Sequence, residues 1–491
     1  MDMLPVTRQF EAALRIVEKL RAAGYEAYFA GGCVRDLVLG REPTDYDVAT
    51  SATPDVVLGM FERTFAVGAH FGVVLVAEGV DEHAQTEVAT FRSDGVYSDG
   101  RHPDEVLYTR SAAEDVQRRD FTINGLLLDP MRLVSRGLKP VDLASVEVRA
   151  EARTLQDSSG FRAAQDDSGV KEPDGLRTAV IDHVGGLADL DAGVIRAIGR
   201  PDRRFEEDHL RLLRAVRFAA RFGFEIEPGT HAAIRALAPR IRMVSRERVR
   251  DELTRMLTEG HARRAFELLD ETGLLAEVLP EVARMKGVEQ PPQFHPEGDV
   301  WVHTLLLLDQ LEQGCAATLA WGALLHDVGK PATFRRAERI RFDGHVEMGV
   351  AMGAEICRRF RFSNEDTRQI LALIENHMRF ADAQRMKAST LKRFFRLEGF
   401  EEHLALHRMD CLAASGNLDN WEFVRGCYEA MPEEAVRPKL LITGRELIAA
   451  GYTPGARFKE MLRAVEDEQL EGTIRTADEA LALVRGRFPE M

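Results

Sequence analysis

The stretch that decides the fold of this chain is GGCVRDLVLGREPTDYDVA, residues 31–49. Its first two residues, Gly31 and Gly32, follow a short apolar run that is typical of a strand. Glycines here let the backbone approach a ligand closely, and the N–H groups that open the next helix suit phosphate oxygens. Asp45 and Asp47 stand two apart in an extended segment, so both carboxylates can point at one place. Two carboxylates beside a phosphate cradle suggest two magnesium ions that hold a nucleoside triphosphate.

The segments around this stretch predict a small α/β unit. Apolar residues at helical spacing over 10–20 indicate a helix, and 25–30 indicate a strand that enters the glycines. Residues 65–76 predict a hairpin, and the alternation around Glu87 predicts another strand. Residues 93–106 are rich in turn formers and predict a mobile loop.

A second motif, RRDFTIN, covers residues 118–124. Arg118 and Arg119 can hold a triphosphate, while Asp120 and Asn124 offer an acceptor and an amide to ribose hydroxyls. An isolated RRD is more often a charge cluster at the start of a helix. Which interpretation holds depends on the motifs around it.

A long helical pattern over 205–224 carries Glu207, Asp208 and Arg211. A carboxylate accepts from the exocyclic amine of a base, and a guanidinium donates to a ring nitrogen or a carbonyl oxygen. Positions 208 and 211, three apart on a helix, are therefore able to read the pairing edge of a base. A surface ion pair is the commoner meaning of this spacing. Arg214 follows on the same helix and is a further candidate for nucleotide binding.

Metal-ligand residue types recur later in the order H…HD…H…H…D. Imidazole nitrogens with carboxylate oxygens suit a transition metal or magnesium that activates water on a phosphate ester. His403 and His407 share a helix face with the last aspartate and compete as ligands, although packing is the commoner role. The candidate ligands are His303, His326, Asp327, His345, His377 and Asp410.

Composition bounds the compartment and the partners of the chain. The 491 residues predict two to four domains, with no stretch as long as a membrane span and no signal-peptide pattern. The five cysteines lack CxxC spacing, which predicts a reducing, cytoplasmic location. Net charge is −15, yet residues 196–264 hold 17 arginines, no lysine and 10 acids. This locally basic segment is compatible with one RNA partner, and solvated helix faces with local ion pairs are an equal alternative.

Together these motifs resemble the class II tRNA nucleotidyltransferases with a C-terminal HD domain, the family of CCA-adding enzymes and bacterial poly(A) polymerases. The resemblance implies an α+β fold whose polymerase-beta-like α/β head is followed by all-helical parts. The expected divisions are a head at 1–150 with an insertion at about 134–180, a neck and body at 181–290, an HD domain at 295–430 and a helical tail at 438–491.

The resemblance also implies the reaction. A tRNA 3′-hydroxyl attacks the α-phosphate of CTP or ATP, held by magnesium on Asp45 and Asp47, with Glu87 as a candidate third acid. Loop 93–106 is expected to help switch the pocket between CTP and ATP. No membrane or DNA partner is expected. The implied nucleotide-binding residues are Gly31, Gly32, Arg35, Asp36, Arg118, Arg119, Asp120, Asn124, Glu207, Asp208, Arg211 and Arg214.

In the HD part, the resemblance implies one metal held by His303, His326, Asp327 and Asp410. His345 and His377 would hold a second metal or contact phosphate. Alternatives stay open: an A-adding enzyme or poly(A) polymerase, an HD phosphohydrolase whose head only binds nucleotide, and a non-catalytic RNA-binding protein.

Overall fold

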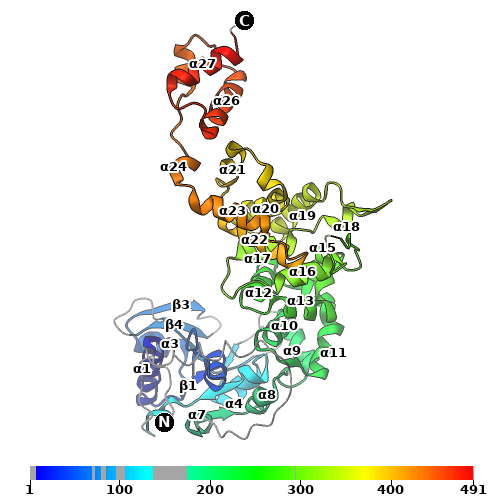
Figure 1. Ribbon diagram of the computed structural model, residues 1–491. Helices are drawn as coiled ribbons and strands as arrows, with labels where there is room; N and C mark the ends of the chain where they lie inside the picture. The colour runs from blue at the N-terminus through cyan, green and yellow to red at the C-terminus, as the bar shows by residue number, and fades with distance from the viewer. Residues whose placement is uncertain are drawn as a thin grey trace. The chain divides into compact units, whose positions relative to one another are not determined.

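The computed structural model describes residues 7–68, 72–78, 85–94, 106–135, 174–293 and 295–489. The chain divides into two compact units, Met1–Val244 with Thr272–Leu274, and Ser245–Glu271 with Leu275–Met491. Most of the strands belong to the first unit, and the second is almost entirely helical (Figure 1). The expected α+β class is confirmed. Most of the predicted loop at 93–106 and of the insertion at 134–180 lies outside the described residues.

A seven-stranded sheet forms the centre of the first unit, in the order β3-β4-β5-β2-β1-β8-β9. Only β2 and β5 run parallel, and the other neighbouring pairs are antiparallel. The predicted strand before the glycines, the hairpin and the strand with Glu87 are all present as β1, β3–β4 and β5. The strands are β1 Ala27–Ala30, β2 Val48–Thr50, β3 Thr64–Gly68, β4 Val73–Ala77, β5 Gln85–Thr90, β8 Leu126–Leu128 and β9 Val180–Asp182.

Helix α1, Arg8–Ala22, covers part of this sheet and contacts β1, β2 and β5. Thr7 caps its first turn by accepting the N–H of Phe10, and its apolar face is buried, as the spacing predicts. Among its described residues, the other helices of this unit are α2 Gly32–Val38, α3 Pro54–Met60, α4 Ala112–Gln117, η2 Thr122–Asn124, α5 Pro130–Ser135, α7 Asp174–Ala179, α8 Gly186–Ala192, α9 Pro201–Glu207, α10 Arg211–Phe222, α11 Pro228–Leu237 and η4 Ala238–Met243. Short strands β6 Arg92–Asp94 with β7 Val106–Tyr108, and β10 Val194–Ile195 with β11 Glu225–Ile226, form two small separate sheets.

The single long helix predicted over 205–224 is wrong, because α9 ends at Glu207 and α10 begins at Arg211. Asp208 between them is extended (φ −147°, ψ 106°), and its Oδ1 accepts the N–H of Leu210 at 3.0 Å. Aspartate commonly ends or begins a helix in this way, because its side chain satisfies a backbone donor that the helix leaves free. The apolar spacing continues across the break and conceals it.

The second unit is built from helices packed around buried side chains such as Trp321, whose Nε1 donates to Thr254 at 2.9 Å. The helices are α12 Arg246–Thr258, α13 Ala262–Glu271, α14 Leu274–Val278, α15 Pro280–Ala283, α16 Val300–Leu308, α17 Ala317–Leu325, α18 Lys330–Thr333, α19 His345–Arg359, α20 Asn364–Asn376, η5 His377–Arg385, α21 Ala388–Phe394, α22 Phe400–Ala413, α23 Asp419–Ala430 and α24 Glu433–Val436, with a small hairpin of β12 Arg335–Arg336 and β13 Ile340–Arg341.

The C-terminal helices α25 Gly444–Ala449, α26 Arg457–Glu471 and α27 Ala477–Arg487 enclose an apolar cluster of their own. These three helices lie in the segment 438–491, which the sequence predicts to be a helical tail. In the described ranges, no helix is both long and apolar enough to cross a membrane.

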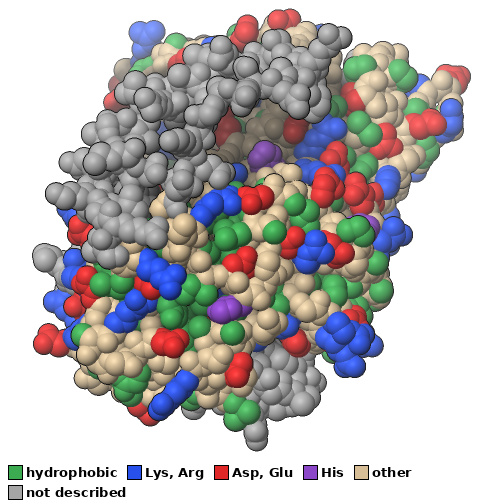
Figure 2. Space-filling model, turned by 90° about the horizontal axis from the view of Figure 1, so that it is seen from below, with side chains coloured by type: hydrophobic (Ala, Val, Ile, Leu, Met, Phe, Trp, Pro, Cys, Tyr) green, Lys and Arg blue, Asp and Glu red, His purple; other side chains and the backbone are tan. Residues whose placement is uncertain are grey.

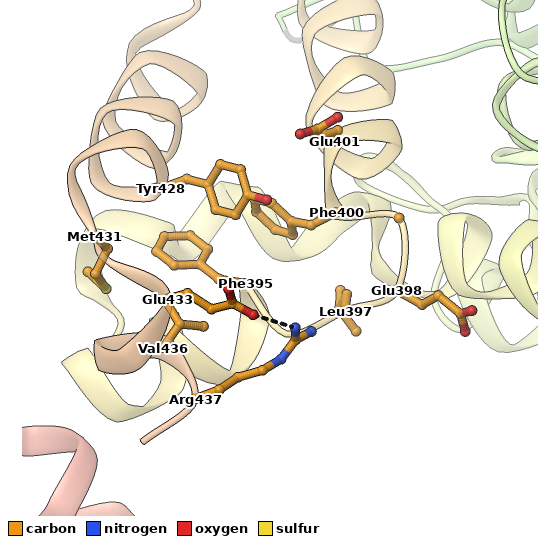
Figure 3. Close-up of a pocket in the computed structure, with 11 residues that line it drawn as sticks. Phe395, Leu397, Glu398, Phe400, Glu401, Tyr428, Met431, Glu433, Val436 and Arg437 are labelled. Atoms are coloured by element: carbon orange, nitrogen blue, oxygen red, sulfur yellow. Dashed lines mark ion pairs between the residues drawn. The ribbon is translucent and has the colours of Figure 1, made fainter. Parts of the chain in front are cut away.

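Aromatic rings line a cavity of about 610 Å³ beside α23 and α24 (Figure 3). Phe395, Phe400 and Tyr428 contact one another, with ring centroids 4.8–5.5 Å apart, and Glu433 pairs with Arg437 at 3.8 Å. These rings belong to an apolar core cluster, so we interpret the cavity as a packing feature.

Charged side chains of both signs intermingle over the face drawn in Figure 2. Within the arginine-rich segment 196–264, several arginines have acidic partners close by. Arg196 pairs with Asp189 at 3.1 Å, and Arg200 with Asp202 at 2.5 Å. Part of the positive charge of this segment is therefore neutralised by local ion pairs. Local ion pairing was the alternative to an RNA partner in the sequence analysis.

Candidate functional site

Burial of Tyr46 sets the direction of the paired aspartates. Its ring is 3% exposed and packs edge-on against Phe10 and Phe29, each with centroids 5.5 Å away. Successive side chains of an extended segment point to opposite faces. Because Tyr46 enters the core, Asp45 and Asp47 both turn to the other side. Sequence reasoning passed over Tyr46, although an aromatic residue between two acids was the available signal.

Glu87 lies beside Asp47 because β2 and β5 pair in parallel register. Val48 is the partner of Val88, so the residues one position earlier, Asp47 and Glu87, are also neighbours. Burial, and then the negative charges of Asp45 and Glu87, raise the pKa of Asp47 to about 7. The three acids therefore share one electrostatic environment, as the sequence predicts.

The three head acids suit a hard divalent cation. Their donors are all carboxylate oxygens, the ligand type that magnesium prefers, and an added cation would relieve the repulsion that raises the pKa of Asp47. The three acids are spaced more widely than the candidate metal ligands of the second unit. Among described residues, the sets of three candidate ligands within 4.8 Å of one another all lie at 295–410.

Gly31 meets two conditions that only glycine satisfies. Its φ is +74°, in the left-handed region, and an added Cβ would lie 3.0 Å from Nη1 of Arg119. Gly32 then begins α2. The glycine turn thus lets the guanidinium of Arg119 lie close to the backbone, and the charge of Arg119 offsets a small part of the rise in the pKa of Asp47.

Asp115 orients both arginines of the second motif and was not predicted. It is 1% exposed on α4, and its Oδ1 accepts from Arg118 at 2.6 Å and 3.0 Å. Its Oδ2 accepts from Arg119 at 3.1 Å and 3.3 Å. Burial would raise the pKa of Asp115, but the charges of Arg119 and Arg118 outweigh it and lower the pKa. The available signal was an acid three and four residues before an arginine pair.

We expect Asp115→Asn to weaken binding of a nucleoside triphosphate about tenfold. The expected loss is that of one charge-assisted hydrogen bond, about 1.5 kcal/mol, because both arginines would lose the carboxylate of Asp115. Equilibrium binding of a labelled nucleoside triphosphate measures this effect. Glu114→Gln, on the exposed side of the same helix, is the matched control. An unchanged affinity in Asp115→Asn would show that the arginines need no such support.

Arg35 and Asp36 face the protein interior. Arg35 is 4% exposed; its Nε donates to Asp36 at 2.9 Å and its Nη1 to Asn124 at 2.6 Å. The guanidinium lies over the rings of Phe222 and Phe218, 4.7 Å and 5.4 Å from their centroids. These contacts brace α2 against α10, and direct nucleotide contact by Arg35 and Asp36 stays a prediction.

Asp120 connects the second motif to α10. Its Oδ1 accepts from Asn124 at 3.1 Å, and its Oδ2 accepts from Arg214 at 2.7 Å and 2.9 Å. Burial would raise the pKa of Asp120, but the charges of Arg214 and Arg211 lower it to about 2. The structure therefore brings together four predicted residues, Arg35, Asn124, Asp120 and Arg214, in one hydrogen-bonded series.

Arg211 is held by groups around the break between α9 and α10. Its Nη1 donates to Glu207 at 2.5 Å, and its Nη2 donates to the carbonyl of Arg118 at 3.1 Å. Arg204, which was not predicted, donates to the same Glu207 oxygen at 2.8 Å and to the carbonyl of Gln117 at 2.6 Å. Glu207 and Arg204 therefore position Arg211.

In the second unit, all six predicted HD residues converge. His303 Nε2 lies 3.0 Å from Asp410, and His326 Nε2 lies 3.1 Å from Asp327 Oδ2. The other oxygen of Asp327, Oδ1, lies 3.7 Å from Nε2 of His377 and 3.9 Å from Nε2 of His345. Among described residues there are three compact sets of candidate ligands, and two of them consist of these residues: His303, His326 and Asp410, and Asp327, His345 and His377. Asp327 therefore contacts members of both sets.

The histidines of this cluster are oriented as metal ligands. The Nδ1 of His303 meets Glu297 at 2.7 Å, and the other three Nδ1 atoms meet backbone carbonyls at 2.7–3.0 Å. These acceptors fix the proton on Nδ1 and leave the lone pair on Nε2. In the part of the chain that the structure describes, Nε2 of His345 and of His377 is buried without a hydrogen-bond partner, and Nε2 of His303 and of His326 faces a carboxylate oxygen 3.0 Å and 3.1 Å away. Such orphaned atoms around two carboxylates fit a divalent metal.

Charge and burial act differently on the histidines of this cluster. Burial would lower the pKa of His303, but its contacts with Asp410 and Glu297 raise it to about 9. Burial lowers the pKa of His377 to about 4, so this imidazole stays neutral near pH 7. Burial would raise the pKa of Asp327, but the neighbouring His326 and Lys330 hold it well below its usual range. Lys330, which was not predicted, donates to Asp327 and to Gln290, both at 2.6 Å.

His403 and His407 stay outside the cluster, as expected from packing. The ring of His407 stacks on Phe380 at 4.3 Å, and burial lowers the pKa of both histidines to about 4.

Comparison with known proteins agrees with this arrangement. Three family models match: the poly A polymerase head domain over residues 27–138, the probable RNA and SrmB-binding site of polymerase A over 223–286, and the HD domain over 299–414. A solved CCA-adding enzyme of Bacillus stearothermophilus, in complex with CTP, has a TM-score of 0.68 at 26% identity and covers 98% of this chain and 99% of its own.

Curated relatives extend the match over the whole sequence. The CCA-adding enzyme of Lactobacillus gasseri is 35% identical over 61% of this chain, and this match spans 64% of that relative. The CCA-adding enzyme of Levilactobacillus brevis is 30% identical over 482 residues, 98% of each chain. Because that similarity runs through nearly all of both proteins, the chain belongs to the family of CCA-adding enzymes.

Proposed function

We propose that the chain adds C and A, from CTP and ATP, to the 3′ end of tRNA without a nucleic-acid template. The observation that carries this proposal is the convergence of Asp45, Asp47 and Glu87 on one face of the sheet, beside the glycine turn and Arg119. Membership of the family of CCA-adding enzymes, and a similar enzyme solved with CTP, support it.

In the proposed reaction, the tRNA 3′-oxygen forms a bond to the α-phosphorus, and the bond to the bridging oxygen breaks to release pyrophosphate. Asp45 and Asp47 would hold magnesium, which would supply neutralisation of the triphosphate charge and a lower pKa for the attacking hydroxyl. Arg118 and Arg119 contact the triphosphate, and Asp115 holds their guanidinium groups in place.

Base choice is assigned to the break between α9 and α10. The carboxylate of Asp208 accepts from the exocyclic amine of cytosine or adenine, and Arg211 donates to the neighbouring ring atom. Uracil and guanine place a carbonyl where the amine should be, so the carboxylate repels them. Glu207 keeps Arg211 aligned through the 2.5 Å contact.

Arg211→Ala should relax the choice of nucleotide more than it weakens tRNA binding. One lost bidentate contact corresponds to about 1–3 kcal/mol, or roughly 5- to 150-fold less preference for CTP over UTP. Incorporation of each labelled nucleotide and tRNA binding are measured separately. Arg203→Ala, an exposed arginine of α9, serves as the control. An unaltered preference would remove the base-reading assignment.

The set of nucleotides added is tested with tRNAs that end at the discriminator base, at C and at CC. Each is offered every labelled nucleotide separately, and the products are sized. Stepwise extension to CCA supports the proposal. Addition of a single A only to the CC end would indicate an A-adding enzyme, and long A tails would indicate a poly(A) polymerase. A cytoplasmic location stays a prediction from the scattered cysteines.

A second function is proposed for the cluster of six HD residues: hydrolysis of a phosphate ester. The four buried Nε2 atoms, gathered around the carboxylates of Asp327 and Asp410, support it. A divalent metal bound there would supply an activated water. The water oxygen joins phosphorus, and the ester oxygen leaves with a proton. Glu297 holds His303 in its ligating tautomer, and Lys330 balances the charge of Asp327.

A further inference from the structure

The HD cluster opens into a cavity of about 1030 Å³. Asp327, His345, His377 and Asp410 line it, and so do residues 339–342. The volume is at the upper end of sites that enclose a whole drug-sized ligand, far above what one phosphate group needs. The cavity therefore has room for several groups attached to the phosphate.

One wall of this cavity belongs to the segment FRRAERIRF, residues 334–342, which we call the arginine hairpin. It holds four arginines and one glutamate, and its strands β12 and β13 pair antiparallel. Arg336 pairs with Glu289 at 3.4 Å, whereas no ion pair is found for Arg339 or Arg341 among the residues that the structure describes. Both unpaired arginines line the cavity. Unneutralised guanidinium groups at the mouth of a site attract polyanions.

Aromatic rings accompany these arginines. Phe334 is 37% exposed, and its ring lies 5.9 Å from that of Phe342. Phe342 reaches the HD cluster directly: its carbonyl meets Nδ1 of His345 at 3.0 Å, and its ring lies 5.4 Å from Nζ of Lys330. The rings thus lead from solvent to the cluster. Arginines interleaved with exposed rings are the combination that binds single-stranded nucleic acid, through phosphates and stacked bases.

We propose that the arginine hairpin docks a single-stranded oligonucleotide whose terminal phosphate ester enters the HD cluster. The proposal deepens the phosphohydrolase function proposed above and rests on it for the chemistry, while the docking itself does not require turnover. Arg339 and Arg341 contact backbone phosphates, and Phe334 stacks on a base. A small phosphate ester would use the cluster without the hairpin.

Docking is measured with a fluorescein-labelled single-stranded RNA of about eight nucleotides with a 3′-phosphate, on the chelator-treated full chain. The double variant Arg339→Ala/Arg341→Ala is expected to bind at least about tenfold more weakly. Its slope of log affinity against log salt should fall by about 1.4, the value for two phosphate contacts on a single strand. Phe334→Ala should weaken binding about 5- to 100-fold with the slope unchanged. Arg336→Ala, which removes one charge from the same hairpin outside the cavity, should change binding less than about twofold.

Hydrolysis of bis(p-nitrophenyl) phosphate by the manganese-supplemented full chain separates the two proposals. The double variant should hydrolyse this small diester at the parental rate. On the 3′-phosphorylated oligonucleotide it should be slower than the parent, because it binds that ligand more weakly. If the small diester is hydrolysed and all variants bind the oligonucleotide equally, the docking proposal is overturned and the phosphohydrolase stands. If no ester is hydrolysed but the double variant loses binding, the docking proposal stands and the phosphohydrolase fails.

Two competitors identify the ligand class. A DNA oligonucleotide that competes as well as RNA supports recognition of phosphates and bases alone, and a weaker one supports additional contacts to the ribose. Polyglutamate that competes as well as either oligonucleotide would overturn the proposal in favour of an acidic protein partner.

Discussion

Asp47→Asn is expected to abolish nucleotide addition and, at the same time, to make the metal-free protein more stable above pH 7. Loss of one carboxylate from the head acids removes several kcal/mol of charge stabilisation in the transition state, so the rate should fall by about 1000-fold or more. The gain in stability comes from removing the same carboxylate, which is repelled by its acidic neighbours. Asp45 and Glu87 crowd this carboxylate, which is why its pKa rises to about 7.

The sign of the pH dependence follows from that pKa. In the folded protein Asp47 titrates near 7, and in the unfolded chain near its ordinary 3.8. Between these values the folded state holds more protons, so folded stability falls as the pH rises through this window and the full cost is present above 7. The difference in pKa sets an upper bound of ~4 kcal/mol on that cost. Asparagine cannot ionise, so Asp47→Asn removes the cost at about pH 8 and much less of it at about pH 5.

Thermal unfolding of the chelator-treated protein at the two pH values measures this effect, and labelled CTP incorporation measures the rate. Asp55→Asn, an exposed acid on α3, is the control and should change neither. Parental incorporation by Asp47→Asn would refute the head assignment. Equal stabilisation at both pH values would show that carboxylate crowding is not the cause.

The second large effect is expected for His326→Ala, which should lose metal from the HD cluster and all phosphohydrolase activity while nucleotide addition stays within about twofold of the parent. The variant removes one of four Nε2 ligands, and the remaining ligands cannot close the gap because their Nδ1 contacts fix their rings. Metal content after dialysis against limiting manganese, and tRNA extension, are measured on the same preparation.

His403→Ala is the matched control, because it removes a buried histidine of the same unit that lies outside the cluster. It should keep the metal. If His326→Ala retains bound manganese at the parental level, the ligand assignment is wrong. If nucleotide addition falls in parallel with metal content, the two activities are not separable as proposed.

Residues whose geometry follows from local periodicity were predicted well. Asp45 and Asp47 share a face because they stand two apart in extended chain, and the HD residues converge as their order implies. The pairing of Asp47 with Glu87 required the strand register, which the sequence does not specify by itself.

Supporting residues were missed for a different reason. Asp115, Arg204 and Glu297 act through hydrogen bonds to other side chains, and charged residues at such spacing are usually surface pairs. Their burial, which only tertiary structure supplies, makes them positioning residues. The break at Asp208 was missed because apolar spacing continues from α9 into α10.

Burial of the Tyr46 ring couples the register of β2 to the packing of the core during folding. A slip of β2 by one residue would push a carboxylate between Phe10 and Phe29 and expose the phenol to water. The hydrophobic interior therefore rejects the same misalignment that would destroy catalysis. A chain whose core packs correctly therefore also has Asp45 and Asp47 on the proper face. A population that is well packed but inactive because of a register shift in β2 should not accumulate.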